Sequence, residues 1–205
     1  MARTQVSVVW CDGRELNGGD VIVRIGIMEG SLRKTSLSRT VGRNAQALAP
    51  ENVDMVHLPS LGDMPLYNQD IQDAGMPKAV TQQSVAIESV DALLIVSPEY
   101  NWSIPGVLKN GIDWLSRLQP NPLEGKPVAI WTVAPGLLGG ARAHQTIRQV
   151  LSSQGMVIMA KPEVQVAGAK GKVDVEAGSI TSEDTADFLR SHLEKFVDFS
   201  RRWNS

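Results

Sequence analysis

The chain has 205 residues, a hydrophobic share of 42% and a formal net charge of −2, which predict one compact domain with a sizeable core. The near-neutral charge argues against nucleic acid or an anionic membrane as the main partner, because phosphate polyanions require clustered positive charge. Cys11 is the single cysteine and the three histidines are dispersed, so we expect neither an internal disulfide nor a metal site.

The first residues differ in character from the rest of the chain. Residues 5–10 have the pattern of an edge strand and residues 14–19 that of a flexible linker, but neither segment carries recognisable chemistry. We expect residues 1–19 to be an extension, flexible or translated from too early a start, and residues 20–205 to form the folded domain. The N-terminus has no signal-peptide pattern and no apolar run is long enough to cross a bilayer, which predicts a cytoplasmic protein.

Short β-branched runs alternate with segments of helical periodicity from residue 20 onward. Residues 91–97 (DALLIVS) are the clearest buried strand, because their apolar run is continuous. Residues 36–48 carry apolar side chains at spacings of three and four, and Pro50 ends that helix. Ser182 is the expected N-cap of the last helix. In chain order the predicted elements are strand 20–28, helix 36–48, strand 53–58, a loop over 59–77, helix 78–89, strand 91–97, helix 104–118 with Pro105 in its first turn, strand 127–133, helix 141–153, strand 156–160 and helix 182–203.

This alternation predicts an α/β fold. Strands that are apolar along their whole length indicate a parallel sheet covered by helices on both faces. Five such strands suit a flavodoxin-like, doubly wound sheet of order 2-1-3-4-5. In these sheets the ligand binds outside the carboxyl ends of the strands. The chemistry is therefore expected in three loops, residues 30–36, 98–103 and 134–140.

The first of these loops, GSLRKTSLS, has the composition of a phosphate-binding turn. It leads into a helix, whose first amides and partial positive charge attract a phosphate dianion. Gly30 allows the backbone to approach a ligand closely, and hydroxyls and a guanidinium add donors. The loop lacks the second glycine of a dinucleotide fingerprint and the pattern of a Walker A loop. It therefore favours a terminal monophosphate; the alternative is a capped helix start with a solvated basic patch.

These residues resemble the phosphate loop of the NAD(P)H-dependent FMN reductase family, and in particular its bacterial chromate/quinone reductase branch. That loop typically reads GSxRxxSxN, and here Ser38 replaces the asparagine while keeping a donor. The resemblance implies non-covalent FMN, with its phosphate held by Ser31, Arg33, Ser36, Leu37 and Ser38.

The second loop follows the most buried strand and is stiffened by two prolines. Aromatic and amide groups between them suit the faces and the polar edge of an isoalloxazine ring. The stretch PEYNWSIPGVLKNGIDWLSR matches the family signature PEYNxSxPGxLKNxIDW over a long contiguous run. The resemblance implies that the ring is lined by Pro98, Glu99, Tyr100 and Asn101. Tyr100 and Trp102 are also candidates for substrate contact, although simple surface packing is the alternative for both.

The third loop repeats the pattern of a strand, a glycine-rich turn and a helix. Small residues there bring the backbone close to the flavin or the incoming nicotinamide, and Gly136 is the expected contact. Arg142 has three possible roles: binding the NADPH phosphate, an inter-subunit ion pair, or a solvated charge on a helix. By resemblance, residues 66–70 lie near the flavin of a neighbouring subunit in a homodimer or homotetramer.

The sequence thus predicts an FMN-dependent oxidoreductase that takes electrons from NADPH or NADH and reduces quinones or other small acceptors such as chromate, ferric complexes or azo compounds. Hydride delivery to the flavin N5 needs no side chain as acid or base, so no catalytic residue is expected. A ping-pong cycle follows if donor and acceptor use the same pocket. The alternatives are a flavin reductase that supplies free reduced FMN to a monooxygenase, and a flavodoxin-type electron shuttle.

Overall fold

The computed structural model describes residues 22–204, so the predictions for residues 1–19 lie outside the described part of the chain. The strands are β1 (Val23–Glu29), β2 (Val53–His57), β3 (Ala92–Ser97), β4 (Pro127–Val133), β5 (Val157–Ile158), β6 (Val164–Val166), β7 (Val173–Asp174) and β8 (Ser179–Ile180). The helices are α1 (Leu37–Arg43), α2 (Ala45–Leu48), α3 (Gln69–Ala74), α4 (Lys78–Glu88), α5 (Gly106–Leu115), α6 (Ala141–Ser152) and α7 (Glu183–Asn204), with 3-10 turns η1 (Leu61–Asp63) and η2 (Ala169–Gly171).

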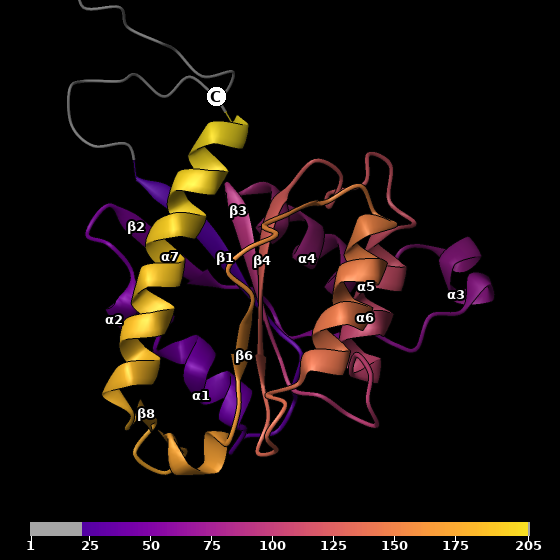
Figure 1. Ribbon diagram of the computed structural model, residues 1–205. Helices are drawn as coiled ribbons and strands as arrows, with labels where there is room; N and C mark the ends of the chain where they lie inside the picture. The colour runs from indigo at the N-terminus through magenta and orange to yellow at the C-terminus, as the bar shows by residue number, and fades with distance from the viewer. Residues whose placement is uncertain (1–21, 205) are drawn as a thin grey trace, which may run out of the picture.

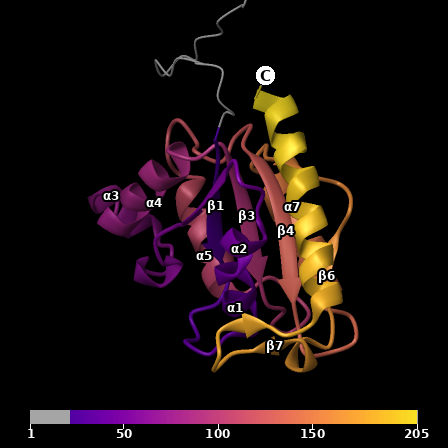
Figure 2. The same cartoon turned by 90° about the vertical axis from the view of Figure 1, so that its left-hand side faces the viewer.

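The main sheet is parallel and has the order β2-β1-β3-β4-β5, as the sequence predicted for a flavodoxin-like fold. Helices α1, α2 and α7 cover one face, and α4, α5 and α6 cover the other (Figure 1). Figure 2 shows the β7–β8 hairpin beneath α1, outside the main sheet.

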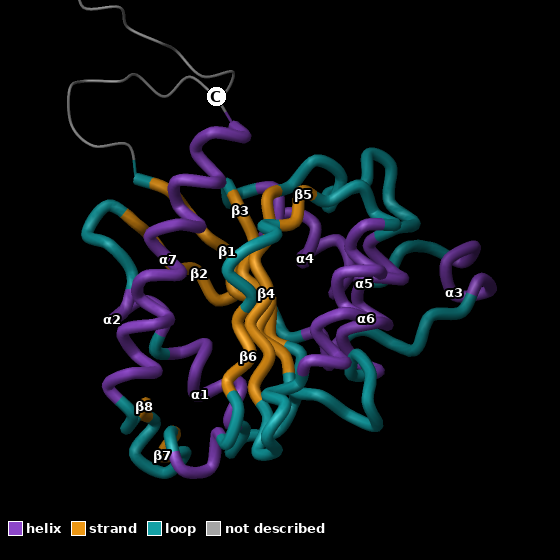
Figure 3. Tube along the Cα trace, in the orientation of Figure 1, coloured by secondary structure: helices purple, strands orange, loops and turns teal. Residues whose placement is uncertain are grey.

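The apolar runs of the sequence form the middle of this sheet. Every residue of β3 and β4 is buried, because helices pack on both faces of these two strands. Trp131 is the largest side chain of the core under α7, and Trp114 belongs to the core on the opposite face. Because a hydrophobic core packs on each face of the sheet, the carboxyl ends of its strands are held in fixed positions. Figure 3 shows the loops that follow β1, β3 and β4 at that common edge.

The fifth position of the sheet differs from the predicted strand 156–160. Two short strands share it: β5 pairs with the start of β4, and β6 pairs with the end of β4. Pro162 lies between them and has no amide hydrogen to donate to a ladder, which explains the interruption. The sequence also gave no indication of the β7–β8 hairpin, whose strands have two residues each.

Three predictions about helices and the loops between them also need correction. The helix over 36–48 is broken at Asn44, whose side-chain amide donates to the carbonyls of Thr40 and Gly178, 2.9 Å away in both cases. The loop over 59–77 contains η1 and α3; α3 buries none of its residues, so it has no amphipathic pattern to detect. Pro105 is the N-cap of α5 rather than a residue of its first turn.

The long C-terminal helix α7 is held at both ends. The hydroxyl of Ser182 accepts from the amide of Thr185 at 3.3 Å, which confirms the expected N-cap. At the other end, Trp203 Nε1 donates to the carbonyl of Gly125 at 2.9 Å, next to the start of β4. Within residues 22–204, no helix is both long and apolar enough to cross a membrane, and no group of side chains is arranged to hold a metal ion.

Candidate functional site

The three predicted loops meet at the carboxyl edge of the sheet. The hydroxyls of Ser31 and Tyr100 are 3.4 Å apart, which joins the first loop to the second. Glu99 Oε2 accepts from the amides of Arg142 and Ala143 at 3.0 Å each, which joins the second loop to the start of α6. The structure therefore places the predicted binding residues of all three loops in one region.

The first loop leaves β1 in a tightly confined path. The amide of Gly30 donates to the carbonyl of Val96 at 2.9 Å, so the loop starts against β3. A Cβ atom at position 30 would lie 2.6 Å from Oγ of Ser97, a distance at which a side chain cannot be accommodated without movement. Glycine is therefore required here because the backbone of the loop packs closely against the side chain of Ser97.

Buried hydroxyls line the end of this loop. Ser36 is the N-cap of α1, and its Oγ lies 3.4 Å from the amide nitrogen of Arg39, which donates to it. Oγ of Ser36 and Oγ of Ser38 are 3.0 Å apart, and both residues are buried, as is Ser31. Two adjacent hydroxyls at the start of α1 and a third at the start of the loop thus lie in the segment where the sequence predicted a phosphate, and their chemistry fits a phosphate dianion.

The basic residues of this region fall into two groups. Arg33 and Lys34 are exposed on the loop itself. Arg39 instead turns back: its Nε donates to Oε2 of Glu29 at 2.7 Å, and its Nη1 donates to the carbonyl of Arg33 at 3.4 Å. Arg39 therefore braces the loop across its two ends, while Arg33 remains the guanidinium that an anion can reach.

The second loop folds back on itself in a tight turn. Tyr100 and Ser103 exchange backbone hydrogen bonds of 3.2 and 3.0 Å, and between them Asn101 and Trp102 have φ values of 50° and 64°. Left-handed φ at both central residues defines a turn in which asparagine is tolerated and tryptophan is strained. Trp102 is 70% exposed. Such strain at a loop tip indicates a position held for a function rather than for packing.

Glu99 has a different environment from the one expected of a ring-lining side chain. Only 13% of its side chain is exposed, and its carboxylate is directed at the first turn of α6. The side chain of Arg142 extends from α6 toward the second loop. Its Nη1 is 3.9 Å from Oε1 of Glu99, and its Cζ lies 4.3 Å from the centre of the Trp102 ring. Arg142 is therefore packed against the second loop and is not an isolated solvated charge.

The third loop is held by a segment that sequence reasoning missed. The amide of Ala134 donates to the carbonyl of Val166, and its carbonyl accepts from Ala169, both at 3.1 Å. The carbonyl of Gly136 accepts from Gly168, also at 3.1 Å. Nothing lies within 4 Å of a Cβ built at Gly136, so this backbone borders open space, as a ligand contact requires. These partners are set only by tertiary pairing, and no local motif marks residues 166–169.

The buried histidines do not belong to the site. Burial lowers the pKa of His144 and lowers that of His192 to about 4. His192 Nδ1 accepts from Trp131 Nε1 at 3.1 Å inside the core under α7. Both imidazoles are thus neutral near pH 7 and lie on helices outside the three loops.

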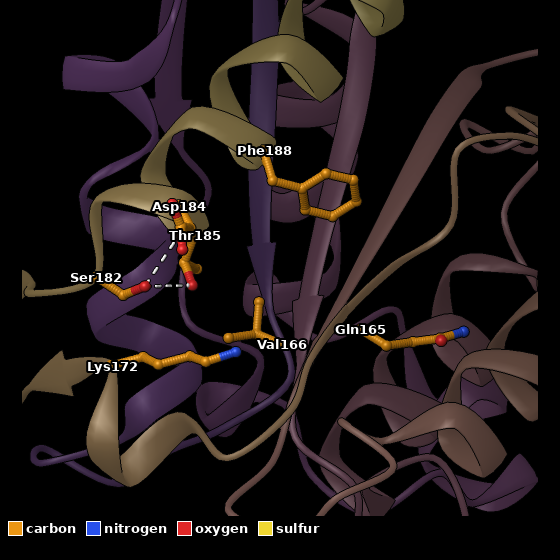
Figure 4. A pocket seen from close by; sticks show the side chains of 7 residues that line it. All are labelled: Gln165, Val166, Lys172, Ser182, Asp184, Thr185 and Phe188. Carbon is orange, nitrogen blue, oxygen red and sulfur yellow. Dashed lines mark hydrogen bonds between the residues drawn. The ribbon is translucent and has the colours of Figure 1, made fainter.

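A separate hollow of about 260 Å³ lies on the α7 side of β6 (Figure 4). Its volume is below the range of about 300–1,000 Å³ that is usual for small-molecule sites. Ser182 faces it but is already engaged in the cap of α7. The residues around it are Gln165, Val166, Lys172, Ser182, Asp184, Thr185 and Phe188. None of them was predicted as a site residue.

The chain is similar to known proteins over most of its length. The family model described as NADPH-dependent FMN reductase matches residues 23–171. A quinone reductase of Escherichia coli (strain K12) is 42% identical over 174 residues, which cover 84% of this chain and 93% of that protein. A 2-hydroxy-1,4-benzoquinone reductase of a Burkholderia species is 35% identical over 180 residues, covering 87% of this chain and 97% of that protein. The solved structure of FerB, a flavoenzyme NAD(P)H:(acceptor) oxidoreductase from Paracoccus denitrificans, is 36% identical with a TM-score of 0.79, over 88% of this chain and 98% of that one.

Proposed function

The chain belongs to the NADPH-dependent FMN reductase family and is an NAD(P)H-dependent, FMN-containing oxidoreductase, and from this premise we propose that its acceptors are quinones. The names of its relatives support this proposal, since two of the proteins compared above are quinone reductases. Chromate, ferric complexes and azo compounds are further acceptors that an open site of this kind accommodates. We propose that donor and acceptor enter in turn, in a ping-pong cycle.

The residues of the first loop fit the phosphate end of FMN. Ser31, Ser36 and Ser38 supply buried hydroxyl donors, of which the last two are adjacent, and the exposed guanidinium of Arg33 supplies a charged donor. Helix α1 has only seven residues, so its dipole adds less than the hydroxyls and the guanidinium do. We assign the phosphate to these four side chains and to the backbone at Leu37.

The second and third loops fit the ring end. Asn101 offers backbone groups held by the tight turn between Tyr100 and Ser103, and Gly136 offers backbone that borders open space. We place Pro98, which precedes this turn and whose carbonyl accepts from the hydroxyl of Ser97, beside them. The hydroxyl of Tyr100 is directed at Ser31, so we place this side chain along the chain that links ring and phosphate. Glu99 contributes through its backbone and through α6, since its carboxylate is engaged there.

When bound, FMN would supply the redox chemistry, which is hydride acceptance from NAD(P)H and two-electron reduction of an acceptor. The protein has to position the flavin ring, leave one face of the ring accessible and place a charged group at the entrance of the site, which we define by Trp102 and Arg142. These two side chains are stacked at that entrance, with Cζ of Arg142 4.3 Å from the centre of the Trp102 ring. We propose that they contact the substrate: the indole a planar quinone, and the guanidinium an anionic group of donor or acceptor.

The observation that carries the proposal is the convergence of the three loops through the Ser31–Tyr100 and Glu99–α6 contacts. The test is steady-state kinetics of the purified holoenzyme with NADPH and a benzoquinone, followed by ferric, chromate and azo acceptors. Parallel double-reciprocal lines are expected for a ping-pong cycle, and intersecting lines would contradict it. Flavin that stays with the protein through gel filtration is expected; flavin that is lost there, together with activity only on free FMN, would favour the flavin-reductase alternative.

Exposed apolar side chains support a proposed homo-oligomer. Leu137 and Leu66, on loops at the carboxyl edge, are 94% and 82% exposed. Leu32 and Leu138 are also exposed on loops at this edge. Exposed large apolar side chains that cluster around one site usually mark a surface that another protein covers. We propose that a second copy of the chain does so, and light scattering during gel filtration should then give at least twice the 22.2 kDa mass of one chain.

A further inference from the structure

Helix α6 receives its N-terminal cap from a residue far away in the sequence. The helix begins after Gly140, whose φ of 86° is left-handed and which has no side chain to act as a cap. The first amides of a helix nevertheless need acceptors. Oε2 of Glu99 accepts from the amides of Arg142 and Ala143, at 3.0 Å each. These are the second and third residues of the helix, whose amides a local N-cap side chain normally serves.

The surroundings of this carboxylate stabilise its charge. The side chain of Glu99 is only 13% exposed, so the charge has lost most of its water and needs compensation from the protein. Helix α6 has twelve residues and presents a partial positive charge at its start. The guanidinium of Arg142 adds a full charge, 3.9 Å from Oε1. Glu99 is therefore fixed in place by two amides, a helix dipole and a cation.

The sequence at the start of α6 makes room for this arrangement. A Cβ atom at Gly140 would lie 2.9 Å from Cβ of Thr132 and 3.6 Å from Cβ of Glu99. A residue with a side chain at position 140 would therefore overlap Thr132 and push the helix start away from β4, whereas the second loop lies at ordinary contact distance. A glycine allows the close approach, and the distant carboxylate replaces the cap that glycine lacks.

We propose that Glu99 is a positioning residue for the cofactor. Its carboxylate holds residues 98–103 against residues 134–140, and so keeps the spacing between the two loops that enclose the flavin ring. This inference rests on the proposed function, which places the ring between those loops. Glu99 acts through α6 and not by contact of its side chain with the ring. Because the Glu99 carboxylate accepts from the amides of Arg142 and Ala143, an anionic group of the donor would meet the Arg142 guanidinium rather than these two amides.

The test compares Glu99→Ala and Glu99→Gln with the native chain, using the full-length protein stripped of FMN and titrated with it. Two quantities are measured: the Kd for FMN and the visible circular dichroism of the bound flavin, which reports the asymmetry around the ring. Glu99→Ala should raise the Kd roughly tenfold, as expected for loss of a helix cap that positions the site, and should change the dichroism. Glu99→Gln keeps an acceptor oxygen for the same amides, so its Kd should stay within about threefold of native.

Ser182→Ala is the matched control, because Ser182 caps α7 through the amide of Thr185 and lies outside the three loops. It should lower the Tm as Glu99→Ala does, yet leave the Kd and the dichroism unchanged. A native Kd and spectrum in Glu99→Ala would overturn the inference, as would an equal loss of FMN affinity in Ser182→Ala. If Glu99→Ala does not fold, Glu99→Asp carries the test, since its shorter side chain keeps the charge but withdraws it from the amides. Failure of the native chain to bind FMN would instead contradict the proposed site.

Discussion

The phenolic oxygen of Tyr100 lies 3.4 Å from Oγ of Ser31, and this pair joins two loops that are 69 positions apart in the chain. The loops follow β1 and β3, which are neighbours in the sheet although β2 lies between them in sequence. The strand order reverses at this point, and doubly wound folds bind their ligands there. The hydroxyl pair therefore connects the two loops that lie on either side of the point where the strand order reverses.

This contact predicts that Ser31 and Tyr100 act together in holding FMN. Ser31→Ala and Tyr100→Phe should each weaken FMN binding, because each removes a hydroxyl from the path between ring and phosphate. The double variant should lose less than the sum of the single losses, with a coupling of about 0.5–1 kcal/mol for one neutral hydrogen bond. FMN titrations of the four proteins measure the coupling, and strictly additive losses would show that the hydroxyls act independently.

Arg33 is the guanidinium assigned to the FMN phosphate. Arg33→Ala should weaken FMN binding by about 1–3 kcal/mol, the range for a hydrogen bond to a charged group. The loss should also diminish at high salt, because screening weakens the native interaction at an exposed position. Arg43→Ala is the matched control: Arg43 is an exposed arginine of the same basic cluster, located in the last turn of α1. Native FMN affinity in Arg33→Ala would contradict the phosphate assignment.

Gly30 is predicted to be irreplaceable at the start of the first loop. In Gly30→Ala the new Cβ would lie 2.6 Å from Oγ and 3.0 Å from Cβ of Ser97, whose hydroxyl donates to the carbonyl of Pro98. Relief of this overlap must shift the loop or β3, which should lower the free energy of unfolding by about 1–3 kcal/mol and weaken FMN binding as well. Urea unfolding and FMN titration measure the two effects.

Two further variants make this prediction specific. Gly171→Ala adds a methyl group where nothing lies within 4 Å, so both its stability and its FMN affinity should remain native. Ser97→Ala combined with Gly30→Ala removes the closer of the two overlapping atoms, and should recover part of the loss. A Gly30→Ala protein as stable as Gly171→Ala would show that the loop adapts freely.

The sequence was sufficient for the order of the main strands and for the edge of the sheet at which the three loops meet. Nearly continuous apolar runs such as residues 91–97 and 127–133 indicate buried parallel strands, because burial on both faces disfavours polar side chains; Ser97 and Thr132 are the buried exceptions. Alternation with helices then makes the strands parallel, the order 2-1-3-4-5 is that of the flavodoxin-like fold which five strands suit, and the carboxyl edge follows from strand direction. Ser182 was recognisable as a cap, because a hydroxyl immediately before a helix acts locally, whereas Ser36 was expected inside its helix and is the N-cap of α1.

The sequence was insufficient wherever a partner lies far along the chain. Glu99 was expected to line the ring, and only the three-dimensional structure shows its carboxylate at the start of α6, 43 residues further on. The two-residue strand β5 and the hairpin β7–β8 are too short to have a period. Asn44 breaks a helix that propensity favours, because the carbonyl of Gly178 accepts from its side chain. In each case a tertiary contact overrides the local pattern.

His192 predicts a specific dependence of stability on pH. Its pKa is lowered to about 4, chiefly because burial disfavours the charged ring, whereas an unfolded chain titrates near 6.5. The native protein therefore binds fewer protons than the unfolded chain between these values, and stability falls as pH drops from about 6.5 to about 4. From pH 7.5 to pH 4.5 this one group should remove about 2–3 kcal/mol from the free energy of unfolding.

The variant that isolates this contribution is His192→Gln, because glutamine does not titrate. In the native chain Trp131 Nε1 donates to Nδ1 of His192 at 3.1 Å, and the glutamine side chain keeps an acceptor for it. Urea unfolding of both proteins at pH 7.5 and pH 4.5 gives four free energies. Acidification should destabilise the native chain by about 2–3 kcal/mol more than the variant, since His144 and the carboxylates titrate in both proteins and cancel in the difference. The variant is expected to be the less stable of the two at pH 7.5, where the native packing of the neutral imidazole is intact. Equal acid losses in the two proteins would mean that His192 takes up its proton without leaving the core.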